Sequence, residues 1–73
     1  MIERKQRMNI ALRLKQLRLN KNLTQQQLAD ALGINQGELS RWESGTTSPS
    51  IKLRRSIADF YGMTVGEIFD NHS

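Results

Sequence analysis

Three places in the sequence carry the same local signal for the start of a helix. At each, a threonine or asparagine that can cap a helix is followed three residues later by Gln or Glu. The caps are Thr24, Asn35 and Thr64, and each is preceded by an apolar residue that can pack against another one four residues after the cap. A chain with three such starts is constrained to short helices that are joined by tight turns.

Glycines mark where these helices end. Gly33, Gly45 and Gly62 each follow an apolar periodic stretch, and glycine adopts the left-handed conformation that closes a helix without a steric penalty. The segment Ser48-Pro49-Ser50 opens a further helix, with either serine as its cap.

An earlier helix is predicted by apolar residues at three- and four-residue steps, Ile10, Leu14 and Leu17. No stretch alternates apolar and polar residues as a strand would. All signals together predict helices over residues 9–21, 25–32, 36–44, 50–61 and 65–69. The predicted fold class is therefore all-α, and the chain of 73 residues has room for one domain, a compact five-helix bundle.

Only three residues, Gly33 to Asn35, join the second and third of these helices. So short a joint makes the helices cross at a steep angle, and Ala29 offers the small side chain that the crossing requires. The positions between the two helices are apolar: Leu28, Leu32, Ile34, Leu39 and Trp42. This spacing is typical of a helix-turn-helix.

The helix at 36–44 has two contrasting faces when its residues are placed about 100° apart around its axis. Leu39 and Trp42 fall on one side, where both are expected to be core residues. The opposite side is polar and short-chained, and it ends in a guanidinium: Gln36, Gly37, Ser40, Arg41 and Ser44. Such a face suits the major groove of DNA, where base edges offer fixed donors and acceptors. A solvated helix face is the alternative interpretation.

The positive charge of the chain is concentrated near its beginning. The net charge is +4, and residues 1–22 hold seven Lys or Arg against Glu3. A small basic domain of this kind favours a polyanion partner, most simply nucleic acid. A solvated, lysine-rich surface would explain the same charge.

The residues that enzymes and metal sites need are scarce. Cysteine is absent, and His72 is the one histidine. No catalytic triad, paired-carboxylate arrangement or phosphate-binding glycine loop can be argued, so we expect neither an enzyme, a metal site nor a cofactor. No apolar run approaches the length of a membrane span, and we expect no membrane partner and a cytoplasmic location.

From about residue 10 to residue 69 the sequence resembles the phage-repressor and Cro-type (XRE-like) helix-turn-helix family. The stretches that carry the resemblance are LRLKQLR, LTQQQLADALGI, LSRWESG, PSI and IADFYGMTVGEIF. The resemblance implies a lambda-repressor-like five-helix domain that binds double-stranded DNA, often as a homodimer on a near-palindromic operator.

The resemblance also implies roles for residues of the 36–44 helix, which would be the recognition helix. Gln36 is placed for a bidentate contact with adenine, and Arg41 for one with guanine or otherwise for a phosphate contact. Ser40 could reach a base or a backbone oxygen. Gly37 has no side chain, so it could allow close approach to the DNA.

The phosphate contacts that the resemblance implies surround the recognition helix: Arg18, Gln25, Asn35, Ser44, Thr46 and Thr47. Gln25 could alternatively be only a helix-forming first residue. Arg18 and Glu43 match a structural ion pair that, in the family, joins the end of the first helix to the end of the recognition helix. Such a pair would fix the angle of the recognition helix.

Three features depart from the family pattern. Thr46 is neutral where the family often has a cation. Arg54 lies on the apolar stripe that Ile51, Ala58 and Tyr61 form along its helix, so it must extend to solvent or find a partner. Leu12 and Leu19 lie opposite the apolar stripe of the first helix, so we expect them to be exposed, as ordinary surface residues or as a partner or dimer contact.

We therefore expect a basic N-terminal extension at 1–8, a DNA-binding domain at 9–70 and a C-terminal tail at 71–73. The extension could lengthen the first helix or form a basic arm. The leading hypothesis for function is a sequence-specific transcriptional regulator, most simply a repressor. An antitoxin or a protein-interaction module with the same fold is the alternative, and Leu12 and Leu19 slightly favour a protein partner.

Overall fold

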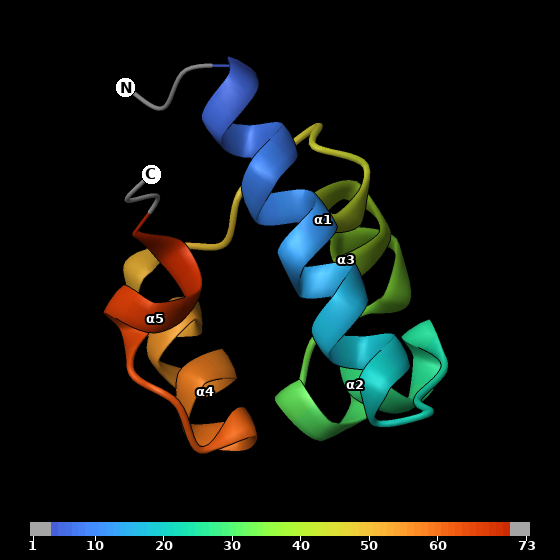
Figure 1. Ribbon diagram of the computed structural model, residues 1–73. Coiled ribbons are helices and arrows are strands. Elements are labelled where there is room, and N and C mark those ends of the chain that lie inside the picture. Colours follow the sequence, from blue (N-terminus) through green and yellow to red (C-terminus); the bar gives the residue numbers. More distant parts are fainter. Residues whose placement is uncertain (1–3, 71–73) are drawn as a thin grey trace.

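The computed structural model describes residues 4–70, which form five helices and no strand (Figure 1). The helices are α1 (Arg4–Asn20), α2 (Gln25–Leu32), α3 (Gln36–Glu43), α4 (Ile51–Tyr61) and α5 (Val65–Phe69). The predicted all-α class is confirmed. The tail at 71–73, with His72, and the first three residues of the predicted extension lie outside the described residues.

The predicted caps are in place at the helix starts. Thr24 and Thr64 each form a reciprocal capping box, in which the third residue of the helix returns a side-chain bond to the cap. Asn35 accepts a 2.7 Å hydrogen bond from the backbone N–H of Glu38, but the Glu38 side chain does not complete a box. Of the two serines considered for α4, Ser50 is the cap. Three independent local signals thus define the starts of α2, α3 and α5.

Gly33 and Gly62 end α2 and α4 in the left-handed conformation, as predicted. The end of α3 differs slightly, because the helix stops at Glu43 and Gly45, with φ of 80°, follows two residues later. α1 differs most: it begins at Arg4 rather than at residue 9, so the extension lengthens the helix over these residues. Its end is followed by Asn22 with φ of 56°, which the sequence analysis did not identify as a turn residue.

α3 packs against both α1 and α2, while α5 packs against α1 and α4 (Figure 1). The largest side chains that this arrangement buries fully are Trp42, Leu39, Ile57 and Ile68. Ala29 is fully buried where α2 meets α3, as the short joint required. Among the helices of residues 4–70, none is long and apolar enough to cross a lipid bilayer.

Arg54 finds its partners within the fold. Its Nε donates to the backbone oxygen of Pro49 at 3.0 Å, and its guanidinium lies 5.0 Å from the centre of the Phe69 ring. Leu53 packs against the core, whereas Ile51, which shares the predicted stripe, is 77% exposed. The first turn of α4 therefore does not use its apolar residues as periodicity alone predicted.

Candidate nucleic-acid interface

The two faces of α3 separate as their side chains suggested. Leu39 and Trp42 are 1% and 2% exposed, so they anchor the helix in the core. Gln36, Ser40 and Arg41 are exposed on the other side. Gly37 and Ser44 are exposed as well. The structure thus leaves the predicted reading face of α3 open to a partner.

A buried ion pair fixes the far end of α3 to α1. Arg18 Nε donates to Glu43 Oε2 at 2.8 Å, and Arg18 Nη2 donates to Glu43 Oε1 at 3.0 Å. Arg18 Nη1 also donates to the backbone oxygen of Leu23 at 2.8 Å. The hydrogen bond to Glu43 raises the pKa of Arg18 above its ordinary value, although burial acts in the opposite direction. The planar guanidinium of Arg18 is bonded both to Glu43 at the end of α3 and to the backbone that follows α1. It therefore fixes the orientation of α3 relative to α1.

Hydrogen bonds continue from this ion pair to the start of α3. Gln25 Nε2 donates to Glu43 Oε1 at 3.1 Å, and Gln36 Nε2 donates to Gln25 Oε1 at 3.3 Å. The first residue of α2 therefore connects both ends of α3. Gln36 is thereby held beside Gln25 at the edge of the exposed face.

A hollow of about 250 Å³ lies between α1, α2 and α3. Its lining residues are Lys15, Gln25, Ser40, Glu43 and Ser44. Glu43 is already paired with Arg18, so the exposed cation at this hollow is Lys15, beside amide and hydroxyl groups. This combination suits an anion such as a phosphate oxygen.

Lys15 was not predicted as a site residue from the sequence. The signal available was its position: it lies one helical turn before Arg18, so both residues can face the same neighbouring elements. The Arg18–Glu43 match could therefore have drawn attention to Lys15 as well.

The loop after α3 presents the hydroxyls of Ser44, Thr46 and Thr47 at the same end of the helix. Ser44 Oγ and Thr46 Oγ1 are 2.8 Å apart, and Ser44 Oγ also donates to the backbone oxygen of Arg41 at 3.1 Å. The backbone N–H groups of Thr46 and Thr47 donate to that same oxygen. These bonds hold the exposed loop close to the end of α3.

The structure brings most of the predicted site residues onto one surface. Asn35 is exposed beside Gln36, although its Oδ1 already accepts the capping bond. Arg18 is the exception, because it is 8% exposed and its nitrogens bond to Glu43 and Leu23. This geometry favours the ion-pair role of Arg18 over the phosphate contact also predicted for it.

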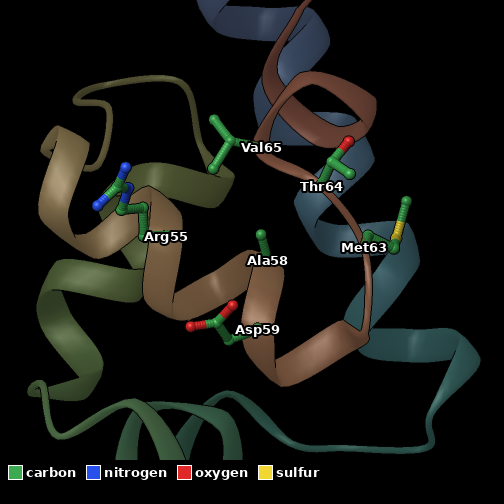
Figure 2. Close-up of a pocket in the computed structure, with 6 residues that line it drawn as sticks. All are labelled: Arg55, Ala58, Asp59, Met63, Thr64 and Val65. Atoms are coloured by element: carbon green, nitrogen blue, oxygen red, sulfur yellow. The ribbon is translucent and has the colours of Figure 1, made fainter.

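A second hollow, of about 310 Å³, lies on α4 and the turn before α5 (Figure 2). Its lining residues are Arg55, Ala58, Asp59, Met63, Thr64 and Val65. Figure 2 shows Arg55 and Asp59 on successive turns of α4. The hollow carries both signs of charge and none of the predicted site residues. Over residues 4–70, no cluster of His, Cys, Asp or Glu could hold a metal ion.

Residues 14–68 match the family model described as Helix-turn-helix, of the XRE type. The chain belongs to this family. The resemblance to phage-repressor and Cro-type proteins is thereby confirmed, and the α2–α3 unit is its helix-turn-helix.

Relatives of this helix-turn-helix chain are named both as activators and as repressors of transcription. It is 41% identical over 56 residues to the HTH-type transcriptional activator BcrR of Enterococcus faecalis, a match that covers 77% of this chain and 28% of BcrR. It is 29% identical over 56 residues to the cryptic phage CTXphi transcriptional repressor RstR of Vibrio cholerae, covering 77% of this chain and 50% of RstR. The chain thus spans half or less of the length of these two relatives.

A solved structure shares the helix-turn-helix fold. The crystal structure of the clp gene regulator ClgR from Corynebacterium glutamicum superposes with a TM-score of 0.78 at 28% identity. The match covers 86% of this chain and 67% of that one. The five-helix arrangement is therefore shared by a gene regulator of modest sequence similarity.

Proposed function

We propose that this chain is a sequence-specific, double-stranded-DNA-binding transcriptional regulator that reads the major groove with α3. The observation that carries the proposal is the division of α3. Gln36, Ser40 and Arg41 are exposed on one face, and the opposite face is anchored in the core by Leu39 and Trp42. A helix held in this way can enter a groove as a rigid element.

The reading roles follow from the chemistry of the exposed groups. Gln36 offers an amide that matches the N6 and N7 positions of adenine, and Arg41 offers a fork that matches O6 and N7 of guanine. Ser40 contacts either a base or a phosphate oxygen. Gly37 keeps the surface low between Gln36 and Arg41.

The phosphate roles belong to the groups around the hollow at α1, α2 and α3. We assign them to Gln25, Asn35, Ser44, Thr46 and Thr47, and we add Lys15. Arg18 acts as a positioning residue through Glu43. Lys15 is the cation among these groups, so the affinity should fall as salt is raised in proportion to the phosphates that it and any other Lys or Arg neutralise.

We further propose that the chain binds a near-palindromic operator as a homodimer. Two copies would place their α3 helices about 34 Å apart, in successive major grooves. The hollow at α4 and α5 supports such a contact, because Arg55 and Asp59 are exposed and form no ion pair within residues 4–70. A two-fold axis would bring each Arg55 to the Asp59 of the second copy.

The proposed action is repression in the cytoplasm, by occupying DNA that the transcription machinery needs. The relatives BcrR and RstR are named as an activator and a repressor, so measuring expression of the regulated gene with and without this chain is the test of repression. Selection of bound duplexes from a pool of random sequences would identify the preferred operator directly.

The decisive experiment measures binding of the selected duplex and a scrambled duplex by fluorescence anisotropy. Gln36→Ala and Arg41→Ala should each weaken binding of the selected duplex by about tenfold or more, and each should relax the preference at one base pair. Gln16→Ala, an exposed glutamine on α1, is the matched control. Equal affinity for the two duplexes, or a double variant that keeps the preference, would refute base reading by α3.

A protein-interaction role is the second candidate, and one observation favours it. Leu12 and Leu19 are 56% and 52% exposed, although α1 already packs its other side into the core. Such residues need not act in DNA binding, so this role is compatible with the first.

A further inference from the structure

α1 carries an apolar stripe on its exposed side. Met8, Leu12 and Leu19 are 46%, 56% and 52% exposed, and the remaining large exposed apolar side chains of residues 4–70 lie on α4. At about 100° per residue, the three fall within about 40° of one another around the helix axis. We call Met8, Leu12 and Leu19 the outer stripe.

Folding of the domain does not explain the outer stripe. Ile10, Ala11 and Leu14 are 5%, 1% and 3% exposed, so the opposite face of α1 already supplies the core contacts. The outer stripe is about half exposed along its whole length, which spans roughly three turns of helix. A line of apolar groups at helical spacing is the kind of surface that receives another helix.

Charge determines which partner fits. The seventeen residues of α1 include no Asp or Glu, and Lys15 is exposed between Leu12 and Leu19 along the helix. A second copy laid against this face would bring its own Lys15 and no acidic residue of α1 to meet the Lys15 of the first, so self-association here is disfavoured. A lipid surface is a poorer match, because interfacial helices bury a wide apolar face and α1 offers a narrow one.

The outer stripe adjoins the candidate nucleic-acid interface. Met8 packs against the loop after α3, since a Cβ at Gly45 would lie 2.5 Å from Met8 Sδ. Lys15 lines the same hollow as Gln25 and Ser44. A molecule bound along the outer stripe would therefore reach the groups to which we assign phosphate contacts.

We infer that the outer stripe docks an acidic amphipathic helix of a partner protein. Apolar residues of that helix would cover Met8, Leu12 and Leu19, and its carboxylates would lie against Lys15. Because Lys15 would then face a carboxylate instead of a phosphate, the docked helix competes with DNA. The docking stands on its own, and only the competition rests on the proposed function.

The test uses two synthetic helical peptides of about 20 residues that share one apolar stripe and carry either Glu or Lys beside it. Binding to the full chain is measured by fluorescence anisotropy at about 0.15 M salt. We expect the Glu peptide to bind about tenfold more tightly than the Lys peptide. The Leu12→Gln/Leu19→Gln variant should lose about tenfold in affinity for the Glu peptide, while Ile51→Gln, at an exposed apolar residue on α4, should lose nothing. Circular dichroism checks that each variant is folded.

Several results would overturn the inference. Equal binding of the two peptides would show that the partner helix need not be acidic. Unchanged binding by the Leu12→Gln/Leu19→Gln variant would show that the peptide does not dock on the outer stripe. Binding of the chain to phosphatidylglycerol vesicles in place of the Glu peptide would identify a lipid surface. Self-association that depends on Leu12 and Leu19 in sedimentation would identify a second copy.

The competition is tested separately with the selected duplex. The Glu peptide should displace the duplex from the wild-type chain, and should displace it about tenfold less effectively from the Leu12→Gln/Leu19→Gln variant. Failure to bind any duplex selectively would refute the proposed function and leave docking to be judged by the peptides. Selective DNA binding without peptide binding would refute the docking alone.

Discussion

The two hollows of the domain are similar in size and differ in how their charges are satisfied. At the hollow between α1, α2 and α3, Glu43 is paired with Arg18, whose side chain is 10% exposed while that of Glu43 is 3% exposed. At the hollow on α4 and α5, Arg55 and Asp59 are exposed and form no ion pair within the described chain.

This difference separates charges that orient the domain from charges that remain available to another molecule. A buried pair resists rearrangement because separating it would leave a charge without solvent or partner. Exposed charges contribute little to stability, and they are free to define a contact. Substitutions of Glu43 and of Arg55 and Asp59 test this distinction directly, and they stand at the two ends of four predictions ordered from the largest expected effect to the smallest.

Glu43→Ala should produce the largest loss, about 3–5 kcal/mol of unfolding free energy, because it leaves the buried Arg18 guanidinium without its partner. Urea unfolding followed by circular dichroism measures the change. The matched control is Arg18→Met/Glu43→Leu, which removes both charges and should recover much of the loss. A change below about 1 kcal/mol for Glu43→Ala would show that the pair does not support α3.

Gly45→Ala should destabilise the domain by about 1.5 kcal/mol, mainly through its left-handed backbone and to a smaller extent because the flexible Met8 side chain must move aside. Residue 45 has φ of 80°, and its new Cβ would lie 2.5 Å from Met8 Sδ. Gly33→Ala, at φ of 72° with open space around the Cβ position, should lose only about 1 kcal/mol. Thermal unfolding compares the two, and adding Met8→Ala to Gly45→Ala should remove the difference. Equal losses for the two glycines would argue against the Met8 contact.

Tyr61 should make the domain less stable at high pH. Burial raises the pKa of Tyr61 to about 12, with a further contribution from Glu43, and its hydroxyl is buried without a hydrogen-bond partner in residues 4–70. Because the folded domain favours the neutral hydroxyl, Tyr61 contributes fully to the unfolding free energy below the ordinary tyrosine pKa of about 10. This contribution is lost as the pH rises towards 12.

The expected size of this loss is about 1 kcal/mol, after allowance for the partial exposure of the ring. Urea unfolding at pH 9, 10 and 11 measures it against Tyr61→Phe, which lacks the ionisable group. The two proteins should differ in slope above pH 10. If the unfolding free energies of the two proteins fall in parallel above pH 10, groups other than Tyr61 cause the loss of stability at high pH.

Arg55→Asp and Asp59→Arg should have the smallest effect on stability, within about 0.5 kcal/mol, because both side chains are exposed. Their effect should fall on self-association, which each single change weakens by about tenfold and the double exchange restores. Sedimentation velocity measures the self-association of the single variants and of the double exchange. A double exchange that dimerises no better than the single variants would place the dimer contact elsewhere.

The sequence predicted the local structure of the α2–α3 unit closely because its signals lie within one helical turn. Thr24 and Asn35 each bond to a backbone N–H three residues away, and Gly33 acts through its own φ. The division of α3 into buried and exposed faces follows from helical geometry in the same way.

Elsewhere the local signals failed or were absent. α1 ends at Asn20 beside a left-handed Asn22, where no glycine marks the turn. Ile51 is exposed, so the periodicity of α4 misassigned this residue, whereas Arg54 finds partners as expected. The Arg18–Glu43 pair was available only from the resemblance to a family, because nothing local relates residues 25 positions apart.

The amino-acid sequence thus determined where the helices start, which face of α3 is polar and which family the chain resembles. Only the tertiary structure decided that Lys15 joins Gln25 and Ser44 at one hollow, and that the predicted pairing with Glu43 leaves Arg18 unavailable for a phosphate contact. The physical reason is the range of the interactions. Caps and helix faces depend on residues three or four positions apart, whereas a site between helices depends on the angles at which packed helices cross.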